Sequence, residues 1–119
     1  MTNQVLTIVS QSNSDSIVNH ALIRATTDAG TATAETFALG FTPRRVKVVN
    51  LTGLIVDEWF EGMAAASSVH TVGSTGVTTL EAVHGITVNS QGNTLGGASI
   101  TLDATTMAAS STFAIEAVG

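Results

Sequence analysis

Short stretches in which hydrophobic and polar residues alternate, separated by turns of small residues, follow one another along most of the chain. A period of two places successive side chains on opposite faces of a β-strand. Many short strands at regular spacing are typical of a sandwich or a barrel. The pattern therefore predicts an all-β fold: a single-domain antiparallel β-sandwich or barrel, jelly-roll-like, with little helix.

The two strongest strands are expected at 44–51 and 54–60, and together they form a central hairpin over 44–61. Weaker alternation and β-compatible residues predict seven further strands. These lie at 20–27, 33–39, 69–72, 77–80, 85–88, 99–102 and 112–117. The best helical stretch is 103–109, where Asp103 can cap one turn.

The first sixteen residues differ from the rest. Residues 4–9 alternate enough to predict a short strand, whereas 10–16 are a polar run typical of a loop, a mobile arm or a frayed terminus. We therefore expect 1–16 to be a strand and an arm, and 17–119 to be one β domain. A signal peptide is not expected, because no basic stretch precedes a long apolar core.

A turn at 52–53 lies between the two strong strands and supplies the glycine that tight hairpin turns favour. Counting outward from this turn places Lys47 opposite Glu58 and Arg44 opposite Glu61. Each cross-strand pair of opposite charge contributes about 0.2–1 kcal/mol, which favours this register over its neighbours. The same count places Val46 opposite Trp59.

The hairpin also concentrates side chains that are rare elsewhere in the sequence. It holds three of the four basic residues, the only tryptophan and one of the four phenylalanines, and the only proline lies just before its first strand. We expect structural or interface roles for seven of its residues. They are Arg44, Arg45, Lys47, Glu58, Trp59, Phe60 and Glu61.

Charge is scarce in this chain. Only 11% of the 119 residues are charged, against roughly 25% in ordinary globular proteins, and Thr, Ser and Ala replace them. A neutral surface is poorly protected against association, so burial against copies of the chain or a larger partner is favoured. The net charge of −5 argues against nucleic acid, and no apolar run approaches the ~18 residues of a membrane span.

The sequence shows no arrangement of catalytic residues. Three histidines and many serines are present, but no nucleophile-elbow pattern surrounds them, and there is no cysteine. The glycines follow no phosphate-binding spacing. Lys47 and Arg44 explain Glu58 and Glu61 as charge pairs more simply than a glycosidase pair or a calcium site. We expect no enzyme activity, no cofactor and no metal site.

Trp59 and Phe60 raise the alternative of a carbohydrate-binding module, because aromatic rings stack on sugars. Tyrosine, common in carbohydrate sites, is absent. The position of Trp59 in the strongest hairpin favours a place in the core or in an interface.

Three stretches resemble small structural proteins of tailed bacteriophages, whose sequences often carry the patterns GF.PR.V.V.N, EW.EGM and GITV. The first pattern matches residues 40–50, the second 58–63 and the third 85–88. The resemblance covers 33–88, with a weaker tail over 99–117. It marks an arrangement of strands, not an active site, so no catalytic residues are carried over.

This resemblance implies a virion structural role, with a place on the capsid surface. The expected function is that of a capsid decoration (cement) protein, which binds the outer capsid surface and bridges capsid subunits. Its expected partners are the major capsid protein and further copies of itself, as a homodimer or homotrimer, with neither nucleic acid nor membrane. A tail or head-fibre component and a surface carbohydrate-binding module remain the alternatives.

Overall fold

The computed structural model describes residues 3–14, 20–89 and 98–119, and this part of the chain is all-β, without a helix. Its nine strands form one antiparallel sheet in the order β1-β2-β9-β4-β5-β6-β7-β8-β3. The strands are β1 (Leu6–Ser14), β2 (His20–Thr27), β3 (Glu35–Ala38), β4 (Arg45–Asn50), β5 (Ile55–Phe60), β6 (Ser67–Val72), β7 (Val77–Asn89), β8 (Ser99–Leu102) and β9 (Thr112–Val118).

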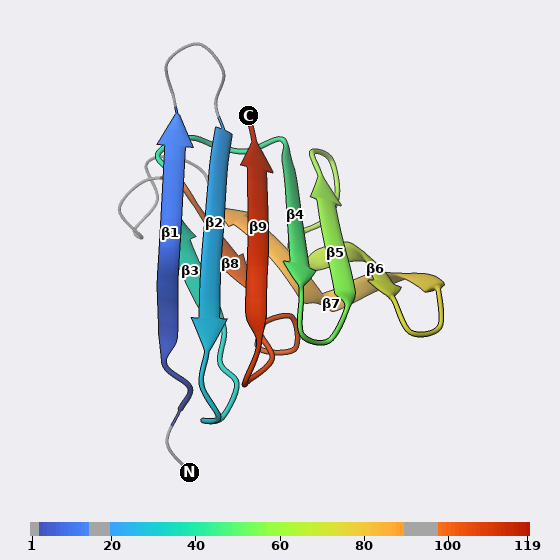
Figure 1. Ribbon diagram of the computed structural model, residues 1–119. Coiled ribbons are helices and arrows are strands. Elements are labelled where there is room, and N and C mark those ends of the chain that lie inside the picture. The colour runs from blue at the N-terminus through green and yellow to red at the C-terminus, as the bar shows by residue number, and fades with distance from the viewer. Residues whose placement is uncertain (1–2, 15–19, 90–97) are drawn as a thin grey trace.

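The sheet curls into a barrel-like domain (Figure 1). Strands β1, β2, β9, β4 and β5 form the front layer, β8 and β3 lie behind it, and β6 and β7 make the turn between them. The edge strands β1 and β3 approach each other without forming a continuous ladder. Side chains connect them: Gln11 Nε2 donates to the Ala38 carbonyl at 2.8 Å, and Gln4 Nε2 donates to Glu35 Oε2 at 3.1 Å.

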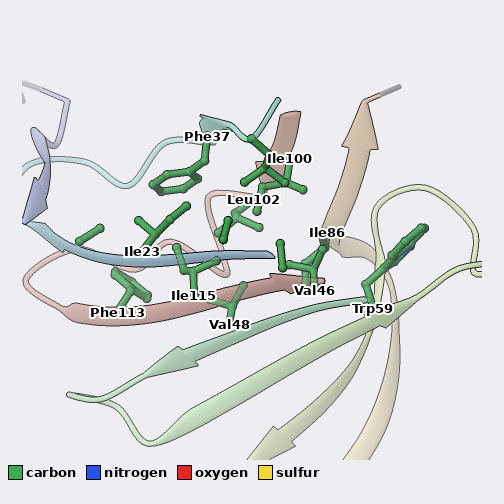
Figure 2. Packing of buried hydrophobic residues seen from close by; sticks show 14 of the residues in the cluster. Ile23, Phe37, Val46, Val48, Trp59, Ile86, Ile100, Leu102, Phe113 and Ile115 are labelled. Carbon is green, nitrogen blue, oxygen red and sulfur yellow. The ribbon is translucent and has the colours of Figure 1, made fainter. Parts of the chain in front are cut away.

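The core lies between the two layers, and β2, β4 and β9 of the front layer turn a largely apolar face toward it. Alternate residues of β2, β4 and β9 are buried, as a half-buried strand requires. Figure 2 shows Phe37 of the rear layer pointing toward Ile23 of the front layer. Burying each large side chain of this kind contributes about 1.5–3 kcal/mol. The labelled residues of this cluster are Ile23, Phe37, Val46, Val48, Trp59, Ile86, Ile100, Leu102, Phe113 and Ile115.

The register expected for the central hairpin is confirmed. Lys47 faces Glu58 and Val46 faces Trp59. The turn differs from the expected two-residue loop, because the ladder ends at the pair Asn50–Ile55 and four residues connect the strands. The Asn50 side chain stabilises this longer turn, because its Oδ1 accepts hydrogen bonds from the backbone amides of Thr52 and Gly53 at 3.0 and 2.8 Å.

Two expectations about secondary structure were wrong. The polar run after residue 9 is not a loop as far as Ser14, because β1 continues and pairs with β2; residues 15–16 lie outside the described part. Backbone ladder bonds need no apolar side chains, so an edge strand tolerates this composition. The stretches 77–80 and 85–88 belong to the single strand β7. Residues 103–109 form no helix, but Asp103 does cap a turn there, as expected, and its Oδ2 accepts the Thr105 amide at 3.0 Å.

Asp28 fastens the start of the chain to the turn after β2. Its Oδ1 accepts the amides of Val5 at 2.9 Å and Gly30 at 3.0 Å. Gly30 permits the close approach, since a Cβ there would lie 2.6 Å from the Asn3 backbone. The bond from the Gly30 amide, followed by that from Val5, lowers the pKa of Asp28, because both favour the charged carboxylate.

This fastening should weaken in acid. A carboxyl whose pKa is lowered by folding stabilises the folded state above its unfolded pKa, and this contribution is lost as the pH falls through the folded pKa. We therefore expect the Val5 and Gly30 amide signals in NMR spectra to titrate together below the usual carboxyl range, with a lower protection of the Val5 amide against hydrogen exchange relative to its intrinsic rate at the same pH. The variant Asp28→Asn keeps an acceptor oxygen but cannot titrate. An identical titration in this control would contradict the assignment.

Candidate interaction surface

The outward-facing side chains of β2, β9, β4 and β5 form one continuous surface, called here the outer face. Because the strands are in register, these side chains lie in cross-strand rows. One row runs Leu22, Glu116, Lys47, Glu58, and continues through Val69 of β6 to Leu80 of β7. The row on one side is Arg24, Ala114, Val49, Val56, and the row on the other is His20, Val118, Arg45, Phe60.

Glu116 joins the charged groups at the centre of the outer face. Its Oε2 lies 3.1 Å from His20 Nε2, and its Oε1 lies 3.5 Å from Arg45 Nη2. Lys47 lies in register between Glu116 and Glu58. All these side chains are partly exposed, so each ion pair stabilises the fold by at most about 1 kcal/mol. The arrangement orders the surface more than it stabilises the domain.

The outer face differs in charge from the molecule as a whole. It carries Arg24, Arg45 and Lys47, which are three of the four basic residues, against the two carboxylates Glu58 and Glu116. The complete chain has a net charge of −5. The outer face is therefore locally positive on an acidic protein, which favours contact with an acidic partner surface.

The far end of the outer face is apolar. Leu80 is 71% exposed and Phe60 is 44% exposed. Beside them lies a pocket of about 210 Å³, which the loop after β5 and strands β6 and β7 enclose. It is lined by Met63, Ala64, Ser67, Leu80 and Ala82. Exposed apolar groups of this kind next to a charged band are typical of protein-binding surfaces.

The structure separates the seven hairpin residues singled out from the sequence. Four of them lie on the outer face, because Arg45 pairs with Phe60 and Lys47 pairs with Glu58, and paired residues point to the same side of a sheet. Trp59 points inward, is 8% exposed, and its Nε1 donates to the Ala64 carbonyl at 3.4 Å. Arg44 and Glu61 form an exposed ion pair of 3.6 Å between Nε and Oε2 beyond the end of the ladder.

A buried polar group, called here the Asp57 cluster (Asp57, Ser68 and His70), was not anticipated from the sequence. Asp57 is 3% exposed, and its Oδ1 accepts the Ser68 hydroxyl at 2.9 Å and the His70 Nδ1–H at 2.8 Å. Asp57 and His70 are cross-strand partners on β5 and β6. The sequence offered one indication of a buried carboxylate: Asp57 lies on the same face of the hairpin as Val48 and Trp59. Its hydrogen-bond partners could not be predicted, because they lie on another strand.

The geometry of the Asp57 cluster suits a structural role. Ser68 donates its proton to the carboxylate and not to His70, so this histidine is not placed to activate it as a nucleophile. Within the described residues, no group of three or more metal-binding side chains could hold an ion. The cluster connects β5 to β6 and supplies partners for a carboxylate that would otherwise be buried alone.

Removing the carboxylate should destabilise the domain. Asp57→Ala leaves the Ser68 hydroxyl and His70 Nδ1–H without their acceptor, and we expect the free energy of unfolding to fall by about 2–3 kcal/mol. Urea denaturation followed by tryptophan fluorescence measures it. The matched control is Glu61→Ala, which removes an exposed carboxylate and should cost less than about 1 kcal/mol. Equal effects of the two variants would exclude a special role for Asp57.

A charge-swap cycle tests the central row of the outer face. Lys47→Glu places a carboxylate between Glu58 and Glu116 and should lower the free energy of unfolding by about 0.5–1 kcal/mol. Adding Glu58→Lys restores one opposite-charge pair but leaves residue 47 facing Glu116. The double variant should therefore recover only part of the loss in urea denaturation. A double variant no more stable than either single variant would contradict the register.

Comparisons with protein-family models, curated proteins and solved structures found no match to this chain. Among the described residues, no helix is long and apolar enough to cross a membrane.

Proposed function

We propose that this protein is a virion structural protein of the capsid decoration type, which binds the outer surface of an assembled shell and bridges neighbouring capsid subunits. The observation that carries the proposal is the outer face. Its central row crosses six strands from Leu22 to Leu80, and both of these end residues are exposed and apolar. A surface with this composition is suited to binding another protein.

The remainder of the molecule is consistent with a binding role. Ten large hydrophobic side chains in the described residues are substantially exposed, which is costly unless some of them are covered by a partner. The groups of the Asp57 cluster are engaged with one another, since Asp57 accepts from both Ser68 and His70. Two of the phage-like sequence patterns fall in part on β4 and β5, which are two of the four strands that form the outer face.

A decoration protein acts by linkage. Binding that requires two neighbouring subunits in their assembled arrangement stabilises that arrangement by RT ln(1 + [L]/Kd), where [L] is the free concentration of the decoration protein. Many weak contacts repeated over a lattice add up to a large effect. No catalytic step is required, and the outer face needs only shape and charge complementarity to the shell.

The carbohydrate-binding alternative loses its principal support. The Trp59 ring is almost completely buried and its Nε1–H is already bonded, so it cannot stack on a sugar in this structure. Asp28 and Asp103 are already engaged with backbone amides of their own loops, those of Gly30 and Thr105. A tail or head-fibre component would use the same outer face and differs in where the protein is located on the particle.

Copy number separates these locations. We expect quantitative mass spectrometry of purified particles to find about one copy of this protein per major capsid protein, or a simple fraction of that ratio, because lattice sites repeat with the shell. A handful of copies per particle would assign the protein to the tail or a fibre. Absence from particles that contain every other structural protein would exclude a virion role.

A further inference from the structure

A hollow in the outer face lies over Ala114. Its volume is about 210 Å³, and it is bounded by side chains of three adjacent strands. Ala114 is small, whereas its cross-strand neighbours Arg24 and Val49 are large, so the surface is depressed between them. The lining residues are Leu22, Lys47, Val49, Ala114, Ile115 and Glu116.

The hollow combines an apolar floor with cations on two sides. Leu22, Ala114 and Val49 supply the floor. Lys47 lies at the rim, and Arg24 lies across it, at roughly 12 Å between Cα atoms from the strand spacing and rise. Both side chains are long enough to converge on one ligand between them.

Within the described part of the chain, neither cation is held in a close ion pair, although Glu116 and Glu58 flank Lys47 across the strands. Across residues 3–14, 20–89 and 98–119, neither Arg24 nor Lys47 belongs to an ion pair within 4.0 Å. The nearby carboxylate of Glu116 is already shared between His20 and Arg45. A ligand that brings a negative charge to this hollow therefore meets two cations that, within the described residues, are not held in an ion pair.

We propose that the hollow binds the side chain of a glutamate on a protein partner. The two methylenes of glutamate would cover the floor formed by Leu22, Ala114 and Val49. Its carboxylate would accept charge-assisted hydrogen bonds from the Arg24 guanidinium and the Lys47 ammonium group. A polyanion such as nucleic acid fits less well, because the whole chain is acidic and the floor is apolar.

This inference rests on the proposed function for the identity of the partner, which would be the capsid subunit. A single side-chain contact binds weakly, and repetition over a shell would supply the avidity. The hollow itself can be tested on the isolated protein, so its failure can be distinguished from failure of the virion role.

The first test is an NMR titration with two neutral-backbone probes, N-acetylglutamate N-methylamide and its glutamine analogue, at constant ionic strength. The glutamate probe should cause saturable shifts at the amides of Leu22, Val49 and Ala114, and the glutamine probe should not. Arg24→Gln and Lys47→Gln should each weaken binding several-fold. Ala114→Leu should abolish it by filling the hollow.

Arg44→Gln is the matched control, because it removes the fourth cation at an exposed position paired with Glu61, away from the hollow. It should leave binding of the glutamate probe unchanged. Equal shifts from both probes would overturn the proposal, as would a loss in Arg44→Gln as large as in Arg24→Gln. Unfolding midpoints of all variants identify any loss that comes from destabilisation.

The second test measures copies of each variant retained on particles. We expect Arg24→Gln and Ala114→Leu to reduce retention relative to wild type, and Arg44→Gln to leave it unchanged. If the wild-type protein is retained and the hollow variants are retained equally well, the capsid subunit does not use the hollow and the inference fails while the virion role stands. If the wild-type protein is absent from particles, the virion role fails and with it the identity of the partner.

Discussion

The ladder that connects β2, β9, β4 and β5 is the interaction on which the rest of the structure depends. Its register places Ile23, Ile115 and Val48 in the core without exposure. Because side chains alternate strictly along a strand, the same register points Glu116, Lys47 and Glu58 outward. A slip of one residue would bury these charges and expose the core, which makes this pairing strongly favoured over its alternatives. The core and the outer face are therefore two consequences of one pairing.

The barrel closes by side chains where the backbone ladder ends. Strands β1 and β3 are edges, and an exposed edge invites pairing with other chains. Gln4 and Gln11 reach across from the β1 side to the β3 side, and Asp28 holds the first residues against the turn after β2. Because the barrel closes through polar side chains, the edge strand β1 can itself be polar. The same side-chain bonds cover the sheet edges, and no helix does so in the described part of the chain.

The polar groups divide by location into two kinds. Inside the fold, Asp57 accepts hydrogen bonds from Ser68 and His70 and so connects β5 to β6. On the outer face, His20 and Arg45 share Glu116, and within the described residues Arg24 and Lys47 are not held in an ion pair. Buried groups without partners would cost folding energy, whereas exposed cations cost little and remain free to bind. A binding surface is consequently compatible with a stable fold of this size.

The strand positions of β2 and β8, the register of the central hairpin and the all-β class could be predicted from the sequence, because period-two alternation and cross-strand charge pairs are local properties. The inward face of the hairpin could not be predicted, since both faces mix apolar and charged residues and the choice depends on packing against the other layer. The tertiary structure also decided that β9 inserts between β2 and β4, which brings Glu116 beside Lys47. The Asp57 cluster and the hollow over Ala114 depend on such pairings. Both features join residues that are distant in sequence, and local sequence patterns do not show which distant residues will come into contact.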